Sequence, residues 1–175
     1  MALQRGIVML EEHNENWKEE YENEKDQLIK LIGKYIIEIH HVGSTSINKL
    51  KAKPIIDILI VIENLDQIEE IDNILKEYDY HNRGAQGVID RIFFAKGPEE
   101  ARTHYLHFTY PNSKTYYDQI YFKRYLNEHP EYIEKYCNLK QELAEKYAQD
   151  RKSYTAGKNE FITNIISLAK EEYND

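Results

Sequence analysis

A glycine, three hydroxyl residues and an acid stand close together in one stretch of the sequence. Gly43 precedes Ser44, Thr45 and Ser46, and Asp57 stands thirteen positions after Ser44. Glycine permits a tight turn and a close approach of the backbone to a ligand. Free N–H groups and the positive end of a helix dipole then favour phosphate at the start of a helix. We therefore expect these glycine and hydroxyl residues to contact phosphate.

Asp57 interrupts the apolar run IIDILIVI at residues 55–62. A run that is apolar on both faces is typical of a strand in the middle of a sheet. A carboxylate there is unfavourable without a partner such as a cation or a metal ion. One interpretation is a triphosphate site beside a metal-binding acid. The other is a serine-rich helix cap followed by a buried aspartate that accepts backbone hydrogen bonds.

Two histidines lie in a strand predicted at residues 103–110. His104 and His107 are separated by an odd number of positions, so their side chains face opposite sides of that strand. His107 can serve as a metal ligand or as a general base near neutral pH. The alternative is a core histidine whose ring nitrogens are satisfied by hydrogen bonds.

Three cations are candidates for phosphate binding. Lys53 stands at the entrance to the apolar run, Arg91 follows Asp90, and Lys158 lies four positions after Tyr154 on one predicted helix face. Asp90 is a second candidate acid. The alternatives are a solvated lysine, a surface ion pair between Asp90 and Arg91, and a surface pair between Tyr154 and Lys158.

The elements expected around these residues give an α+β fold, with strands early and helices late. Residues 1–112 form the predicted core, and residues 113–175 form a helical C-terminal extension packed on it as one structural unit. The pair His129-Pro130 separates two helices of that extension. The expected core elements are a helix between Asn14 and Gly33, a strand ending at Gly43, one or two helical turns over 45–51, a strand over 55–62, a helix over 66–78, and strands over 88–95 and 103–110.

Composition narrows the classes of partner. The formal net charge of −8 and the pI of about 5.4 oppose binding to extended nucleic acid, although a small phosphorylated ligand can still occupy a local basic pocket. A single cysteine, Cys137, excludes an internal disulfide and a multi-cysteine zinc site. No apolar run reaches membrane-spanning length, and the start MALQRGIVMLEEH turns acidic too soon for a signal peptide. We expect a cytoplasmic protein.

The string HVGSTSINKLKAKPIIDIL at residues 41–59 closely resembles the signature of the GrpB family. Members of that family look like the nucleotidyltransferase superfamily, with its glycine-serine turn and strand carboxylate. The resemblance continues through RTHYLHF (102–108), YLNEHPEY (125–132) and DRKSYTAGKNEFI (150–162), so it covers nearly the whole chain in order. Asn48-Lys49 stands where the family usually has Pro-Gly, which loosens the turn.

The resemblance implies a nucleotidyltransferase-like mixed sheet with helices packed on one face and a helical C-terminal extension. It also implies that Gly43 and Ser44 face nucleotide phosphates, that Asp57 faces magnesium, and that the helix face with Lys158 closes over the nucleotide. Active nucleotidyltransferases usually carry a second acid two residues after the first, where this chain has Leu59. Two-metal chemistry requires several oxygen ligands.

Two functions follow from this combination. The first is Mg²⁺- or Mn²⁺-dependent transfer of a nucleotidyl group from a nucleoside triphosphate to an unknown acceptor, with Asp57 and His107 as catalytic and metal-binding residues. The second is a catalytically inactive module that binds a nucleotide or another phosphorylated metabolite. A scaffold that binds a protein partner through the acidic, tyrosine-rich helical end is a third class, and no sequence feature singles it out.

Overall fold

The computed structural model describes residues 8–173, which form a five-stranded mixed sheet with the strand order β1–β2–β5–β4–β3. β2 and β5 are parallel, and every other neighbouring pair is antiparallel. Most of the N-terminal segment that bears on a signal peptide lies outside the described residues. The strands are β1 (Glu38–Val42), β2 (Ile56–Val61), β3 (Tyr80–Gly84), β4 (Ile92–Lys96) and β5 (His104–Thr109).

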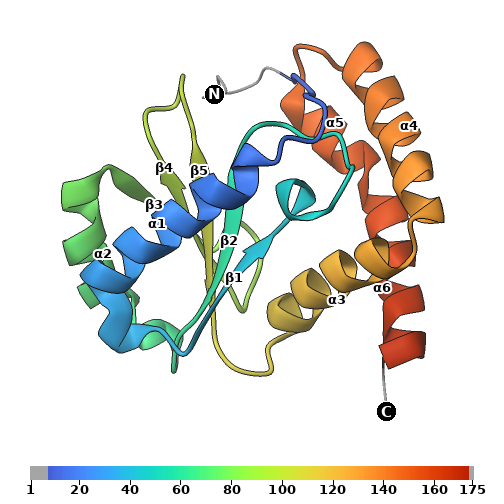
Figure 1. The fold of residues 1–175 in the computed structure, drawn as a ribbon. Coiled ribbons are helices and arrows are strands. Elements are labelled where there is room, and N and C mark those ends of the chain that lie inside the picture. The colour runs from blue at the N-terminus through green and yellow to red at the C-terminus, as the bar shows by residue number, and fades with distance from the viewer. Residues whose placement is uncertain (1–7, 174–175) are drawn as a thin grey trace.

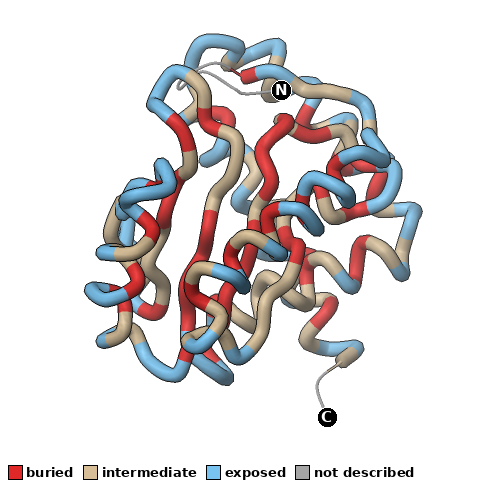
Figure 2. Tube along the Cα trace, turned by 60° about the vertical axis from the view of Figure 1, so that its left-hand side comes forward, coloured by how far each residue is buried: buried red, intermediate tan, exposed pale blue. Residues whose placement is uncertain are grey.

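β2 is an interior strand, because β1 pairs with one of its edges and β5 with the other. Five of its six residues are buried, as the apolar run predicted, and only Asp57 is partly exposed. The predicted bounds of 55–62 differ from the observed Ile56–Val61 by one residue at each end. Figure 2 shows buried residues running along the inner strands and along the helix sides that face them.

Two N-terminal helices, α1 (Asn16–Ile32) and α2 (Ile68–Leu75), cover one face of the sheet (Figure 1). Alternate residues of β2 project to this face and pack against the apolar side of α1. The resulting core contains Trp17, Leu28 and Ile32 of α1 with Ile56, Ile58 and Ile60 of β2.

The C-terminal helices are α3 (Lys114–Glu128), α4 (Glu131–Lys146), α5 (Arg151–Gly157) and α6 (Asn159–Tyr173). They lie on the other side of the sheet from α1 and α2 (Figure 1). The apolar sides of α3, α4 and α6 enclose a second core together with Ile47 and Leu50, which belong to the connection between β1 and β2. The predicted α+β fold with a helical extension is confirmed. Pro130 separates α3 from α4, because proline lacks the N–H that a continuing helix would need.

Two local predictions were wrong, and one strand was missed. Residues 88–91 form a loop, and the strand predicted at 88–95 begins only at Ile92. β3 was not predicted, because an edge strand with one fully buried residue, Tyr80, shows no apolar alternation. The turns predicted over 45–51 shrink to a 3₁₀ turn at Ser44–Ser46.

Within residues 8–173, no helix combines the length and the apolar composition needed to cross a membrane.

Candidate functional site

Gly43 and Asp57 meet where β1 ends. Val42 pairs with Asp57 across the antiparallel β1–β2 ladder, so the chain leaves β1 beside the carboxylate. Gly43 has a φ of +71°, and a Cβ at this position would lie 2.6 Å from Oδ2 of Asp57. Glycine is required here both for the backbone conformation and for the space that the carboxylate occupies.

The three hydroxyl residues after Gly43 point to different places. Ser44 lines a cleft together with Asp57. Oγ1 of Thr45 is buried 2.9 Å from Nε2 of His41, and Oγ of Ser46 donates a 2.6 Å hydrogen bond to the carbonyl of Gly43. Thr45 and Ser46 do not line the cleft. A single 3₁₀ turn has only a small dipole, so a phosphate in the cleft would need positive charge from elsewhere.

The cleft consists of two neighbouring cavities of about 430 Å³ and 720 Å³, which fall in the size range of small-molecule sites. Ser44, Asp57, Arg91 and Lys158 line both cavities and form the junction between them. We call the smaller cavity the cationic arm and the larger one the mixed arm. His107 and Asp90 line the mixed arm.

The cationic arm is named for the positive side chains that line it. Among residues 8–173 they are Lys53, Arg91, Lys140, Arg151 and Lys158, which we call the cationic cluster. The one carboxylate that lines this arm in the same part of the chain is Asp57. If all five cations are protonated, the formal charge is five minus one, or +4, in a chain whose net charge is −8. The cationic cluster is therefore a region of positive charge in a chain whose net charge is negative.

Three lysines of the cationic cluster have lowered pKa values. Burial, followed by the nearby charges of Lys158 and Arg151, lowers the pKa of Lys53 to about 7. Burial is also the main cause that lowers the pKa of Lys158 to about 8, although Asp57 opposes the shift. For Lys140, burial and the charges of Lys158 and Lys53 lower the pKa well below its ordinary value. A bound anion would offset this unfavourable burial of positive charge.

Two members of the cationic cluster were missed by sequence reasoning. Nζ of Lys140, which is only 1% exposed, donates hydrogen bonds to Oγ of Ser44 at 2.9 Å and to the carbonyl of Lys51 at 2.7 Å. Arg151 donates from Nη1 to the Tyr105 hydroxyl at 3.1 Å. A signal did exist for Lys140, because it stands one helical turn after buried Tyr136, a position where a lysine is unusual.

The cations predicted from sequence also reach the cleft. Lys53 and Lys158 lie over the ring of Tyr154, with Nζ 5.3 Å and 4.7 Å from its centroid. Tyr154 belongs to α5, and Lys158 directly follows that helix with helical backbone angles, so the predicted contact between residues four positions apart is present. Nη2 of Arg91 donates to the carbonyl of Ala85 at 3.2 Å, which keeps the guanidinium between the two arms.

His107 positions the carboxylate of Asp57. Its Nε2 lies 2.9 Å from Oδ1 of Asp57, and the Asp57 side chain is 26% exposed toward the cleft. Leu59, which pairs with His107 in the sheet, is buried and supplies no oxygen. The role of His107 that this geometry supports is orientation of Asp57.

The residues around Asp57 offer few metal ligands. In the described part of the chain, the one group of three or more His, Cys, Asp or Glu residues with ligand atoms close together is Glu128, His129 and Glu172, which does not line the cleft. Mg²⁺ commonly binds to one or two carboxylates plus substrate phosphates. Asp57 can therefore contribute one carboxylate to a divalent cation, and within residues 8–173 no group of three or more such residues with ligand atoms close together lines the cleft.

Asp90 does not replace the missing acid. Its carboxylate accepts hydrogen bonds from the backbone N–H of Thr115 at 3.0 Å and from Oγ1 of Thr115 at 2.6 Å. Burial raises the pKa of Asp90, but the hydrogen bonds from Thr115 outweigh burial and hold that pKa below its ordinary value. The oxygens of Asp90 thus anchor the loop before β4 to the start of α3.

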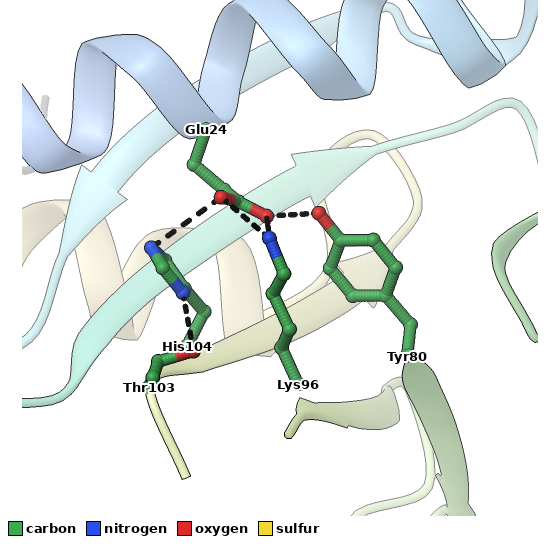
Figure 3. Close-up of polar contacts among 5 residues, drawn as sticks. All are labelled: Glu24, Tyr80, Lys96, Thr103 and His104. Carbon is green, nitrogen blue, oxygen red and sulfur yellow. Dashed lines mark hydrogen bonds and ion pairs between the residues drawn. The ribbon is translucent and has the colours of Figure 1, made fainter. Parts of the chain in front are cut away.

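His104 lies on the opposite face of the sheet from His107, as the odd spacing predicted. Figure 3 shows its ring beside Glu24 of α1, with Nε2 3.5 Å from the carboxylate. Lys96 contacts the same carboxylate at 2.8 Å and 3.0 Å, and the Tyr80 hydroxyl donates to it. Burial lowers the pKa of His104 despite the nearby Glu24. This buried cluster joins α1 to the sheet and is separate from the cleft.

Comparison with known proteins identifies relatives over most of the chain. A sequence profile described as GrpB protein matches residues 7–168. The chain is 36% identical to the glutamate-rich protein GrpB of Alkalihalophilus pseudofirmus, covering 95% of this chain and 98% of that protein. It is 35% identical to the UPF0157 protein YqkA of Bacillus subtilis, covering 90% of this chain but 46% of that protein, so it spans about half of that relative.

A solved structure agrees with these sequence matches. The crystal structure of the conserved protein GrpB from Enterococcus faecalis matches with a TM-score of 0.89 and 29% sequence identity, covering 95% of this chain and all of that one. The predicted family is confirmed by the profile, the relatives and the fold together. The chain belongs to the GrpB family.

Proposed function

We propose that this chain binds a nucleoside triphosphate, or a phosphorylated metabolite of similar charge, in the cleft around Ser44 and Asp57. The observation that carries the proposal is the convergence of the cationic cluster on a single carboxylate. Phosphate oxygens form short, charge-assisted hydrogen bonds with lysine and arginine. An anion with several charges would complement the formal charge of the cationic arm and would return the buried lysines to their protonated state.

Two further properties favour a small ligand over a nucleic acid. The cationic arm has a volume of about 430 Å³, which suits a phosphate chain rather than a long backbone. The net charge of −8 repels extended polyanions outside the cleft. The positive charge is therefore suited to selecting a short ligand that can enter the cavity.

Each residue at the junction of the two arms has a distinct part in this proposal. Gly43 leaves room for Asp57, and Ser44 presents a hydroxyl that Lys140 holds in place. Arg91 can direct paired N–H groups at a phosphate. A divalent ion that arrives on the nucleotide would neutralise phosphate charge, and Asp57 would contribute a carboxylate oxygen to its ligands.

Transfer of a nucleotidyl group to an acceptor is the second candidate function. The observation that favours it is the hydrogen bond between His107 and Asp57, which holds a carboxylate where both arms of the cleft meet. In this candidate, Asp57 would position the nucleotide and its ion, and His107 would keep the carboxylate oriented.

Binding can be tested by thermal unfolding and calorimetry with ATP and inorganic tripolyphosphate, each in EDTA, Mg²⁺ and Mn²⁺. A ligand at one hundred times its Kd should raise the free energy of unfolding by about 2.7 kcal/mol. Lys158→Met should weaken binding of both ligands, whereas Lys152→Met, which removes an exposed charge nearby, should leave it unchanged. Failure of both ligands to bind under every condition would refute the proposed function.

Transfer needs a separate measurement. Labelled nucleoside triphosphates are incubated with each metal and with a cell extract that supplies acceptors, and pyrophosphate release is followed. If the protein transfers nucleotides, either Mg²⁺ or Mn²⁺ should support release, because both ions bind carboxylate and phosphate oxygens. Asp57→Asn should abolish release, and His107→Ala should lower it more than His104→Ala does. Intact binding without labelled acceptor would leave binding as the function.

A further inference from the structure

We propose that the mixed arm of the cleft binds the uncharged nucleoside of the same ligand, with its planar base, while the cationic arm binds its phosphates. This inference rests on the proposed function and adds a second subsite to it. The two arms share Ser44, Asp57, Arg91 and Lys158, so one ligand can pass from one arm into the other through this junction.

The chemistry of the mixed arm differs from that of the cationic arm. Val88 and Ile89 from the loop before β4, Phe122 from α3, and Ile162 and Ile166 from α6 give it apolar walls. α3 and α6 pack against each other beside the sheet (Figure 1), so the walls formed by Phe122, Ile162 and Ile166 come from elements fixed in place. An apolar cavity with a few polar groups is the usual environment of a small organic ligand.

The charged groups of the mixed arm that lie away from the junction already have partners. Asp118 forms ion pairs with Lys114 and, at 3.2 Å, with Lys170. The carboxylate of Asp90 is satisfied by Thr115. In contrast to the cationic arm, this part of the cleft has no excess of positive charge among the described residues, and a phosphate would gain little there.

Two amides in the mixed arm can recognise a polar edge. The side chains of Gln119 on α3 and Asn159 at the start of α6 line the arm and form no hydrogen bond within residues 8–173. An amide offers both a donor and an acceptor, which matches the donors and acceptors on the edge of a nucleobase. Apolar walls with free amides therefore suit a planar heterocycle better than a second anion.

Ile89 is an almost fully exposed residue of the mixed arm. Its side chain is 97% exposed, although a large aliphatic side chain is normally stabilised by contact. The loop around it includes Gly84, Gln86 and Gly87, all with positive φ, and this conformation presents Ile89 at the rim of the cleft. A planar group in the mixed arm would give Ile89 the apolar contact that it lacks.

The experiment compares inorganic tripolyphosphate with the four common nucleoside triphosphates by calorimetry, at equal free Mg²⁺. At least one nucleotide should bind wild type about tenfold more tightly than tripolyphosphate, since a tenfold ratio needs only the contact of part of one apolar side chain. Ile89→Ser and Gln119→Ala should each lower this preference about threefold or more. Both should leave tripolyphosphate affinity unchanged.

The variants are chosen to leave the fold intact, because Ile89 is exposed and the Gln119 amide forms no hydrogen bond within residues 8–173. Ile37→Ser, which removes an exposed isoleucine outside the cleft, is the matched control and should keep the wild-type preference. Equal affinity of wild type for tripolyphosphate and all four nucleotides would overturn the inference while leaving phosphate binding in place. An unchanged nucleotide preference in both variants would also overturn it. Absence of binding by every ligand would overturn the proposed function itself.

Discussion

Nζ of Lys140 donates a hydrogen bond of 2.9 Å to Oγ of Ser44 and thereby connects α4 to the turn that ends β1. The two residues belong to different parts of the fold, the helical extension and the sheet. Arg151 and Lys158 also come from the extension. The C-terminal helices therefore complete the cationic arm, in addition to packing on the core.

Replacement of Lys140 tests this role of the extension. Lys140→Met should lower the affinity for tripolyphosphate by about tenfold or more, because it removes a cation and the hydrogen bond that fixes Ser44. Lys146→Met removes an exposed charge from the end of the same helix and should have no effect. Calorimetric titration of the two variants gives the comparison. Equal affinities would show that Lys140 is only a structural contact.

Gly43→Ala should destabilise the protein by about 3 kcal/mol. The strain of the backbone at Gly43, with φ +71° and ψ −174°, contributes about 1–3 kcal/mol, and the new Cβ would also meet the carboxylate of Asp57 at 2.6 Å. Gly84→Ala is the matched control, because Gly84 has a φ of +73° and no atom within 4 Å of the position of a Cβ. Urea unfolding should show a loss of only about 1 kcal/mol for this control. Similar losses in both variants would mean that Asp57 does not press against Gly43.

The free energy of unfolding should rise between pH 7 and pH 9. In the folded chain the pKa of Lys53 is about 7 and that of Lys158 about 8, whereas an unfolded lysine keeps its ordinary value of 10.5. Between these values the unfolded state binds more protons than the folded state, so stability increases with pH. The two lysines together give an expected gain of roughly 4 kcal/mol across this range.

The dependence of the free energy of unfolding on pH should also change when a ligand binds. Bound tripolyphosphate favours the protonated lysines and raises their pKa values in the folded state. Saturating tripolyphosphate should therefore flatten the rise in stability, and so should the pair of changes Lys53→Met and Lys158→Met. Urea unfolding at pH 7, 8 and 9 measures the slope in each case. If neither the ligand nor the substitutions alter the rise in stability with pH, that rise does not come from Lys53 and Lys158.

Glu24→Ala should separate stability from binding. Loss of this buried carboxylate leaves Lys96, Tyr80 and His104 without their shared partner, at an expected cost of about 3 kcal/mol. Glu22→Ala, an exposed change on the same helix, should cost less than about 0.5 kcal/mol. Affinity for tripolyphosphate should stay within about twofold of wild type in both, because the cluster faces away from the cleft. A large loss of affinity in Glu24→Ala would mean that the buried cluster on one face of the sheet influences binding in the cleft on the other face.

Local patterns were sufficient to predict part of this site. The apolar run that became β2 identified an interior strand, and the glycine before Ser44 identified the turn that approaches Asp57. Both inferences depend on residues that are close together in the sequence. The burial of the apolar run and the backbone conformation that Gly43 permits can each be recognised from such a local pattern. The opposite orientations of His104 and His107 followed in the same way from the geometry of a strand.

The rest depends on contacts between distant segments. Lys140 and Ser44 are 96 positions apart, and only the packing of α4 on the β1–β2 connection brings them together. Thr45 and Ser46 carry the hydroxyls expected at a phosphate site, but a turn of three residues directs those hydroxyls to His41 and Gly43. The sequence thus predicted the place of the cleft and three of its five cations, but not Lys140 and Arg151.

The most direct test of the account is the dissociation constant of tripolyphosphate in EDTA, measured by calorimetry for wild type and for the double variant Lys53→Met/Lys158→Met. We predict wild-type binding in the micromolar range, on the order of −8 kcal/mol, and a loss of about a hundredfold or more in the double variant, because each lysine contributes a charge-assisted hydrogen bond. The control Lys18→Met/Lys30→Met makes the same change of charge at exposed positions of α1 and should bind as wild type does. Equal binding by the double variant and wild type, or no binding by wild type, would contradict the claim that the cationic cluster is a phosphate site.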